Sequence, residues 1–371
     1  MRIGVVGGVA RSLINFRGPL LRAMIERGHE VIACAPDISD EVSASLSKMG
    51  VKKCYSIPLW RTGMNPFHDF KTYNSLRSIF EKERPDCVLS YTIKPVIYGS
   101  LAAQAVNVPG VFSMITGLGY AFTSTTIKQR FLRAVVQPLY RQALKGNTVV
   151  FFQNPDDQAL FVDRRLVRDV SRTVVINGSG VDLEYYSRAE PVTERIVFLL
   201  IARLLRDKGI YEYVEAAKQI KAKYPEIIFQ LVGPLDSNPS AISPTTVEAW
   251  HKEGIIEYLG EAKDVRPHIG AASVYVLPSY REGTPRTVLE AMAMGRPIIT
   301  TDAPGCRETV RDGINGFLVP VKDVRRLVEA MERFIENPSL IPKMGEESWK
   351  VATEKYDVRK VNAAILDVMG L

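Results

Sequence analysis

Short apolar segments alternate with helical segments along this chain, and the alternation runs twice, which limits the fold more than any other feature of the sequence. In the first run an apolar segment at 2–6 leads through a glycine turn into a helical segment at about 16–27, and a second apolar segment follows at 31–35. The alternation restarts with an apolar segment at 195–202. Strands that alternate with helices are typical of open parallel sheets with helices on both faces. The sequence therefore predicts an α/β protein with two doubly wound, Rossmann-like domains.

The length of the chain leads to the same division. Single hydrophobic cores stop growing at about 250–300 residues, and this chain has 371. We expect an N-terminal domain over 1–186, a C-terminal domain over 187–355, and a final helix within 356–371 that can pack back on the N-terminal domain. Ligands of open α/β sheets bind beyond the carboxyl ends of the strands, so residues that follow strands are the first candidates for function.

The net charge of +7 belongs to the N-terminal half. Residues 1–185 carry 23 Lys and Arg against 15 Asp and Glu, whereas the remainder carries 25 against 26. A basic surface suits nucleic acid, an anionic membrane or a phosphorylated substrate, and charge alone does not choose among them. A nucleic-acid binder would interleave aromatic residues with its basic patch. No such module is recognisable, so we expect no nucleic-acid partner.

The cysteines and the apolar runs indicate the cellular compartment of the protein. The four cysteines show neither a CxxC pair nor the spacing of metal ligands, which favours free thiols in a reducing environment. The sequence opens on a strand-length apolar segment rather than on a secretory signal, and no apolar run approaches the ~18 residues of a membrane span. We expect a cytoplasmic protein that can be peripheral on the inner face of the cytoplasmic membrane.

The strongest candidate site is the loop after the expected strand at 274–277, where Glu282 and Glu290 are eight residues apart. If a helix begins near Arg286, both carboxylates can face one site. Amide groups at the start of a helix bind anions, and a carboxylate can accept two hydroxyls of a sugar or a ribose. The alternative is that Glu290 caps its helix and Glu282 is solvated.

A second candidate follows the first strand of the C-terminal half. Arg203 and Lys208 stand where that strand ends and a helix begins. Two fixed cations beside a helix N-terminus suit a diphosphate. The alternative is a solvated, charged loop.

These two segments, in this order, resemble the retaining glycosyltransferases of family 4. The stretches 176–182, 295–300 and 313–319 are also similar to family signatures, so the resemblance covers the C-terminal half almost end to end. It implies the GT-B fold, in which two Rossmann-like domains face each other across a cleft and the last helix crosses back to the first domain. It also implies transfer of a sugar with retention of the anomeric configuration.

The resemblance assigns roles to the residues that would bind the nucleotide sugar. Arg203 and Lys208 would neutralise its diphosphate and stabilise the leaving nucleotide, so that neither a metal nor a cofactor is required; the chain contains no Asp-x-Asp. Glu290 would hold the ribose hydroxyls and Glu282 the sugar hydroxyls on the reacting face. Catalysis would thus rest on Glu282, Arg203 and Lys208. The other residues expected to line the nucleotide-sugar site are Gly7, Gly8, Leu259, Gly283, Thr284, Arg286 and Thr287.

Two departures from the family pattern stand out. Thr284 and Pro285 replace a frequent Phe-Gly, and a proline has no N–H to donate to phosphate. The family often places a histidine in the N-terminal part of the cleft, whereas this chain has Thr116 in that stretch. Thr116 or a backbone carbonyl is the candidate group there.

The N-terminal half narrows the branch of the family. The stretches 15–19, 91–95, 116–119, 280–285 and 303–308 look like the subgroup that extends sugars on undecaprenyl diphosphate. This resemblance implies a hexose or N-acetylhexosamine, such as GalNAc or GlcNAc, moved from a UDP-sugar to a lipid-diphosphate-linked sugar. The residues expected to bind that acceptor are Arg61, Lys94, Thr116 and Gly117.

The helix expected at 127–145 has an apolar stripe flanked by basic residues. Such a helix can lie in the interface of an anionic membrane, but most such stripes face a protein core, and the sequence leaves both alternatives open. Phe131, Leu132, Val135, Val136, Leu139, Tyr140 and Ala143 make up the stripe.

Three rival functions share parts of this pattern. A dinucleotide-dependent oxidoreductase would fit the first strand–helix–strand unit, but Gly4, Gly7 and Gly8 do not make a GxGxxG motif. A GT-B-fold sugar-nucleotide epimerase or hydrolase would share the fold and the nucleotide sugar. A non-catalytic sugar-nucleotide-binding subunit of a polysaccharide assembly complex would not need the complete set of site residues that this chain has. That set is Arg203, Lys208, Glu282 and Glu290.

Overall fold

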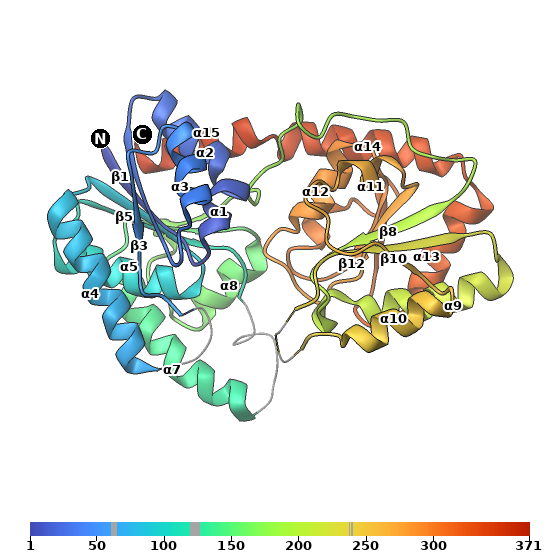
Figure 1. The fold of residues 1–371 in the computed structure, drawn as a ribbon, viewed down its shortest axis with the longest axis horizontal. Coiled ribbons are helices and arrows are strands. Elements are labelled where there is room, and N and C mark those ends of the chain that lie inside the picture. Colours follow the sequence, from blue (N-terminus) through green and yellow to red (C-terminus); the bar gives the residue numbers. More distant parts are fainter. Residues whose placement is uncertain (61–64, 119–126, 237, 239) are drawn as a thin grey trace. The chain divides into compact units, whose positions relative to one another are not determined.

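The computed structural model describes the chain except for residues 61–64, 119–126, 237 and 239, and it describes no side chains at 127–133 (Figure 1). Contacts between residues divide the chain into an N-terminal unit, residues 1–179 with 359–371, and a C-terminal unit, residues 180–358. The division falls a few residues before the expected boundary at 186.

The N-terminal unit is built on a seven-stranded parallel sheet with the order β3-β2-β1-β4-β5-β6-β7. The order reverses between β1 and β4, so a ligand is expected beyond the carboxyl ends of these two strands. The strands are β1 (Arg2–Val6), β2 (Glu30–Ala35), β3 (Lys53–Ser56), β4 (Cys87–Tyr91), β5 (Gly110–Ile115), β6 (Val149–Phe152) and β7 (Thr173–Val175).

Helices cover both faces of this sheet and form a core on each (Figure 1). The helices α4, α5, α7 and α8 pack on one face, and α1, α2, α3 and α15 pack on the other. Val361, Ile365 and Leu366 of α15 are buried in the second core, so the end of the chain belongs to the N-terminal unit. The helices are α1 (Ala10–Asn15), α2 (Gly18–Glu26), α3 (Asp40–Lys48), α4 (Pro66–Glu83), α5 (Ile93–Ala105), α7 (Ile127–Leu144), α8 (Pro155–Asp163) and α15 (Val358–Met369).

The single helix expected at 16–27 is instead the pair α1 and α2. Helix α1 ends at Asn15, and α2 begins at Gly18 with Pro19 in its first turn. Proline lacks an N–H and fixes φ, which suits the first turn of a helix and not its interior. The prediction of one helix is wrong because Pro19 starts a helix here.

The C-terminal unit repeats the plan with six strands in the order β10-β9-β8-β11-β12-β13, again all parallel. Its order reverses between β8 and β11. The strands are β8 (Val197–Ile201), β9 (Ile228–Val232), β10 (Glu257–Tyr258), β11 (Val274–Leu277), β12 (Ile298–Thr301) and β13 (Gly316–Val319). The helices are α9 (Ile210–Lys223), α10 (Pro244–Lys252), α11 (Arg266–Gly270), α12 (Arg286–Ala293), α13 (Val324–Glu336) and α14 (Leu340–Lys355). Two parallel, doubly wound sheets confirm the predicted α/β architecture.

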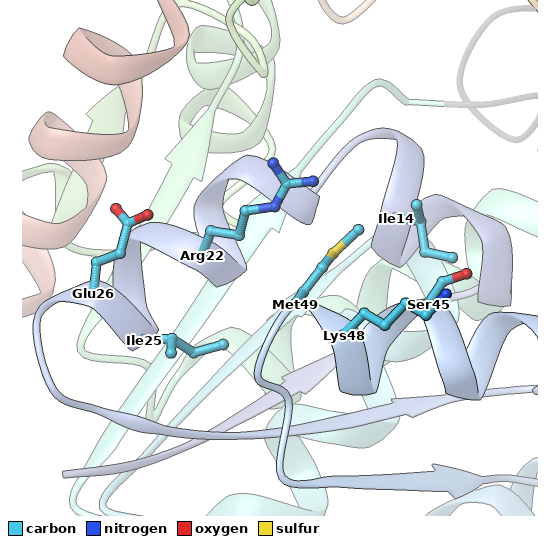
Figure 2. Close-up of a pocket in the computed structure, with 7 residues that line it drawn as sticks. All are labelled: Ile14, Arg22, Ile25, Glu26, Ser45, Lys48 and Met49. Carbon is cyan, nitrogen blue, oxygen red and sulfur yellow. The ribbon is translucent and has the colours of Figure 1, made fainter.

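A groove of about 450 Å³ lies on the N-terminal unit between α1, α2 and α3 (Figure 2). None of the residues predicted from the sequence to bind a substrate lines it. The predicted site residues instead follow the carboxyl ends of the strands. The residues that line the groove are Ile14, Arg22, Ile25, Glu26, Ser45, Lys48 and Met49.

Candidate functional site

An ion pair lies at the point where the strand order of the C-terminal unit reverses. Lys208, in the segment after β8, has its Nζ 2.5 Å from Oε1 of Glu282, in the loop after β11. Ser279 Oγ donates to the same carboxylate oxygen at 2.8 Å. The side chains of Lys208 and Glu282 are 16% and 15% exposed, so this carboxylate is not solvated. The structure thus brings together two residues that the sequence predicted for one site.

The two loops that carry this pair are joined along their backbones. Tyr280 N donates to Asp207 O at 2.9 Å, and Ser279 Oγ is 3.1 Å from the same carbonyl. Gly209 has φ +71°, and a Cβ there would lie 2.0 Å from Pro278 O. Only glycine fits so close to a neighbouring backbone in this conformation. The fit fixes where Lys208 stands relative to Glu282.

The loop after β12 supports the Glu282 loop from behind. Glu282 N donates to Pro304 O at 2.9 Å. Gly305 has φ +81°, and a Cβ at this position would lie 2.2 Å from Glu282 O. The stretch 303–308 was recognised only by its family resemblance, and its supporting role was missed, although Pro-Gly after a strand is a turn signal.

Glu290 lies inside α12 with 5% of its surface exposed. Its Oε1 accepts from Tyr186 Oη at 2.8 Å and pairs with Arg286 Nε at 2.8 Å. The N-cap of α12 is Pro285, so Glu290 does not cap its own helix. Burial raises the pKa of the Glu290 carboxyl, while the Arg286 guanidinium and the Tyr186 hydroxyl act in the opposite direction. Tyr186 was missed because it lies far away in the sequence.

Arg203 does not join the Lys208–Glu282 pair. Its side chain is 46% exposed, and its Nη1 lies 3.0 Å from Oδ2 of Asp236, which follows β9. A partly exposed guanidinium remains available to an anion, because an exposed ion pair contributes little free energy and exchanges partners at low cost. Asp236 was not among the predicted residues.

The remaining predicted residues of the C-terminal unit fall into three situations. Leu259 follows β10 and is 40% exposed. Thr287 uses its hydroxyl inside the protein, where Oγ1 accepts from Tyr275 at 2.7 Å and lies 3.3 Å from Ile201 O. Only its amide is left for a phosphate. Gly283 and Thr284 precede α12, buried and half-buried respectively.

In the N-terminal unit, Gly7 and Gly8 follow β1 where the strand order reverses. The Gly7 amide already donates to Cys34 O at 2.9 Å. A Cβ at Gly7 would lie 2.3 Å from Tyr91 Oη, and one at Gly8 would lie 2.6 Å from Thr92 Oγ1. These glycines therefore let β1 and β4 end close together, and the Gly8 amide is the one left as a candidate for phosphate.

The residues predicted for the acceptor follow neighbouring strands of the same sheet. Lys94, after β4, has its Nζ 2.7 Å from Oδ1 of Asp69 on α4, and both side chains are 16% exposed. Thr116 and Gly117 follow β5 and are half-buried. Arg61 lies outside the described residues.

The apolar stripe of α7 can be followed only in its second half, because the side chains of Phe131 and Leu132 lie outside the described part. There Val136, Tyr140 and Ala143 are buried in the core beside α5 and α8. Among the described residues, no helix combines the length and the apolar character that crossing a bilayer requires. In the same residues, no cluster of three or more His, Cys, Asp or Glu could hold a metal ion.

Comparison with known proteins places this chain in a family. Residues 195–337 match the model for glycosyl transferases group 1, and residues 16–178 match the model for a glycosyl transferase 4-like domain. The chain is 30% identical to an N,N'-diacetylbacillosaminyl-diphospho-undecaprenol alpha-1,3-N-acetylgalactosaminyltransferase of Campylobacter jejuni, over 92% of this chain and 91% of that protein. It is 28% identical to a UDP-Gal:alpha-D-GlcNAc-diphosphoundecaprenol alpha-1,3-galactosyltransferase of Escherichia coli, over 78% and 76% of the two chains.

Solved structures agree on the fold. A sucrose-phosphate synthase from Thermosynechococcus elongatus aligns over 99% of this chain and 98% of its own with a TM-score of 0.82 at 17% identity. The Anabaena protein HepE, solved in complex with UDP, aligns over 100% of both chains with a TM-score of 0.79 at 17% identity. The fold is thus GT-B, and the chain belongs to the glycosyltransferases of family 4 and is a hexosyltransferase.

Proposed function

We propose that this enzyme moves a hexose or N-acetylhexosamine, such as GalNAc or GlcNAc, from a UDP-sugar to a sugar carried on undecaprenyl diphosphate, in bacterial glycan assembly. The observation that carries the proposal is the Lys208–Glu282 pair, which holds a cation and a carboxylate side by side at the strand reversal. The names of the Campylobacter and Escherichia relatives supply the class of acceptor.

The C-terminal unit would bind the nucleotide sugar. The Lys208 ammonium would exchange the Glu282 carboxylate for the diphosphate, and the freed carboxylate would accept hydroxyls of the sugar. Arg203 is exposed enough to add a second positive charge. Glu290, held by Tyr186 and Arg286, would accept the two ribose hydroxyls.

The reaction would proceed with retention and without a metal. The bond between the anomeric carbon and the diphosphate oxygen breaks, and a bond to the acceptor hydroxyl forms on the same face of the sugar. The departing phosphate oxygen takes the proton of that hydroxyl. Lys208 and Arg203 stabilise the charge that develops on the nucleotide, as preorganised cations do in a site shielded from water.

The N-terminal unit would hold the acceptor. Lys94 would bind its diphosphate after release from Asp69, and Thr116 and Gly117 would border its sugar. The acceptor is a membrane lipid, so we place the enzyme on the inner face of the cytoplasmic membrane. The basic helix at 127–145 is one candidate for contact with anionic lipid.

A nucleotide-release assay with EDTA present tests the proposal. The protein is incubated with a panel of UDP- and GDP-sugars, with and without a short-chain polyprenyl-diphospho-sugar, beside a Glu282→Ala control. We expect release of UDP from one UDP-sugar, only with the acceptor and only from the unmodified enzyme. Release without acceptor would indicate hydrolysis, and loss of release in EDTA would contradict metal independence. An NMR spectrum of the product reports the anomeric configuration.

A further inference from the structure

We propose that the start of α4 is a surface by which the N-terminal unit contacts a lipid bilayer. We define the α4 tip as Trp60, Phe67, Phe70 and Lys71. The inference rests on the proposed function in that a lipid-linked acceptor requires the enzyme to work at a membrane. It adds a second, separate surface to the helix at 127–145.

The α4 tip exposes three large aromatic side chains to solvent. Phe67 is 80% exposed and Phe70 62%, the highest values among the large apolar side chains of the described residues, and Trp60 is 44% exposed. Phe67 and Phe70 are three residues apart in one helix and therefore lie on the same face. Exposed aromatic residues gathered in one place mark a binding surface rather than the usual scatter of single apolar residues.

Local contacts hold this surface in place. The rings of Trp60 and His68 stack with centroids 4.0 Å apart. The Asn65 side chain caps α4 by accepting from Phe67 N at 3.0 Å. Phe70 in turn stacks on Tyr73. Aromatic rings fixed beside polar groups are suited to the boundary between lipid headgroups and acyl chains.

The charge of the N-terminal unit as a whole fits an anionic bilayer. The N-terminal unit carries 25 Lys and Arg against 14 Asp and Glu, a net +11, whereas the C-terminal unit carries 23 against 27, a net −4. Lys71 is exposed. Asp69 is the acidic residue in the first turn of α4, and Lys94 neutralises it. An exposed cation beside aromatic rings favours anionic lipid over a neutral or acidic partner.

The same ion pair connects the α4 tip to the predicted acceptor site. Asp69 lies in the turn between Phe67 and Phe70, and its carboxylate is 2.7 Å from Lys94 at the start of α5. A lipid whose chain stays in a bilayer at the α4 tip would therefore present its diphosphate close to Lys94. This places the bilayer contact where a membrane-bound acceptor needs it.

Vesicle flotation tests the inference. The full chain, a Phe67→Ser/Phe70→Ser variant and a Val170→Ser control are mixed with vesicles of phosphatidylcholine, with or without phosphatidylglycerol. Val170 is 52% exposed in the same unit. We expect the double variant to bind the anionic vesicles at least about tenfold more weakly than the unmodified chain. The control should bind them like the unmodified chain. Transfer to a short-chain, water-soluble acceptor should be unchanged in both.

Trp60 provides a second measurement, which does not depend on the double variant. The chain has three tryptophans, so the signal of Trp60 is the part that a Trp60→Phe variant lacks. That part of the emission should shift to the blue on anionic vesicles and be quenched by brominated acyl chains. Equal vesicle binding by the double variant and the unmodified chain would overturn the inference. So would a change of oligomeric state in the double variant without vesicles, because the surface would then bind protein.

The two proposals fail separately. If the unmodified chain transfers sugar to the short-chain acceptor but does not bind vesicles, the α4 tip is not a membrane surface and the proposed function stands. If it binds vesicles through the α4 tip but transfers no sugar to a polyprenyl-diphosphate acceptor, the proposed function fails and the surface stands.

Discussion

Lys208 and Glu282 form an ion pair of 2.5 Å in which both side chains are largely buried. The pair joins the segment after β8 to the loop after β11, the two strands at which the sheet order reverses. Each residue neutralises the other. A bound diphosphate sugar would offer new partners to both at once, a phosphate to the ammonium and hydroxyls to the carboxylate.

Replacing Glu282 by glutamine should lower kcat/KM by about 100-fold or more, the magnitude typical of losing one preorganised electrostatic group. The amide keeps the shape of the carboxylate and can still accept from Ser279, so cooperative unfolding should be retained. Steady-state kinetics and thermal unfolding check both points. Glu253→Gln, at the exposed end of α10, is the control, and near-normal turnover of Glu282→Gln would contradict the assignment.

Gly305→Ala should impair the enzyme through the Glu282 loop without touching substrate. Its Cβ would lie 2.2 Å from Glu282 O, and the position also has φ +81°. Gly313 has a similar φ of +74° but nothing within 4 Å. Both variants pay backbone strain of about 1–2 kcal/mol, and thermal unfolding should show it. Only Gly305→Ala should also lower kcat. Equal activity in the two variants would contradict the role of Gly305 in supporting the Glu282 loop.

Much of the architecture follows from the sequence, because the alternation of strand and helix is a local property that burial on both faces of a sheet imposes. Lys208 and Glu282 follow the carboxyl ends of two parallel strands, so both lie at the same edge of the sheet. The helix break before α2 was also readable in principle, since Gly18 and Pro19 are start signals.

The partners of the site residues were not predictable in the same way. Ser279 is close to Glu282 in sequence, but Tyr186 reaches Glu290 across 104 residues and Asp236 reaches Arg203 across 33. Hydroxyls and carboxylates have no periodicity that marks such contacts, because tertiary packing alone brings them together. The pairing of Lys94 with Asp69 was missed for the same reason.

Glu290 should give nucleotide binding an unusual pH dependence. Burial raises its pKa, and only the ionised carboxylate accepts two ribose hydroxyls. UDP affinity should therefore fall as the pH falls through the raised pKa, at a higher pH than for an ordinary carboxyl. The same protonation removes a buried charge, so the contribution of Glu290 to stability should rise over that range. Calorimetric titration and unfolding against pH test both signs.

Tyr186→Phe should move the loss of UDP affinity at low pH, the acid limb of the pH profile, to higher pH. The reason is that the Tyr186 hydroxyl is one of the groups that lower the Glu290 pKa. Tyr185→Phe is the matched control, since the neighbouring ring is retained and the Glu290 contact is made by Tyr186. A Glu290→Gln variant should show weak affinity without the limb. An unshifted limb in Tyr186→Phe would contradict the role of this hydroxyl.

Lys94→Ala should raise the acceptor KM while leaving UDP-sugar binding unchanged. A hydrogen bond to a charged group contributes about 1.5–3 kcal/mol, which corresponds to roughly a ten- to hundredfold rise in KM. Asp69→Asn separates this role from a structural one, because it breaks the same ion pair but leaves the ammonium in place. If Lys94 binds the diphosphate, Asp69→Asn should keep or improve the acceptor KM. If the ion pair only stabilises the packing of α4 on α5, both variants should lower the unfolding temperature alike and change the acceptor KM alike.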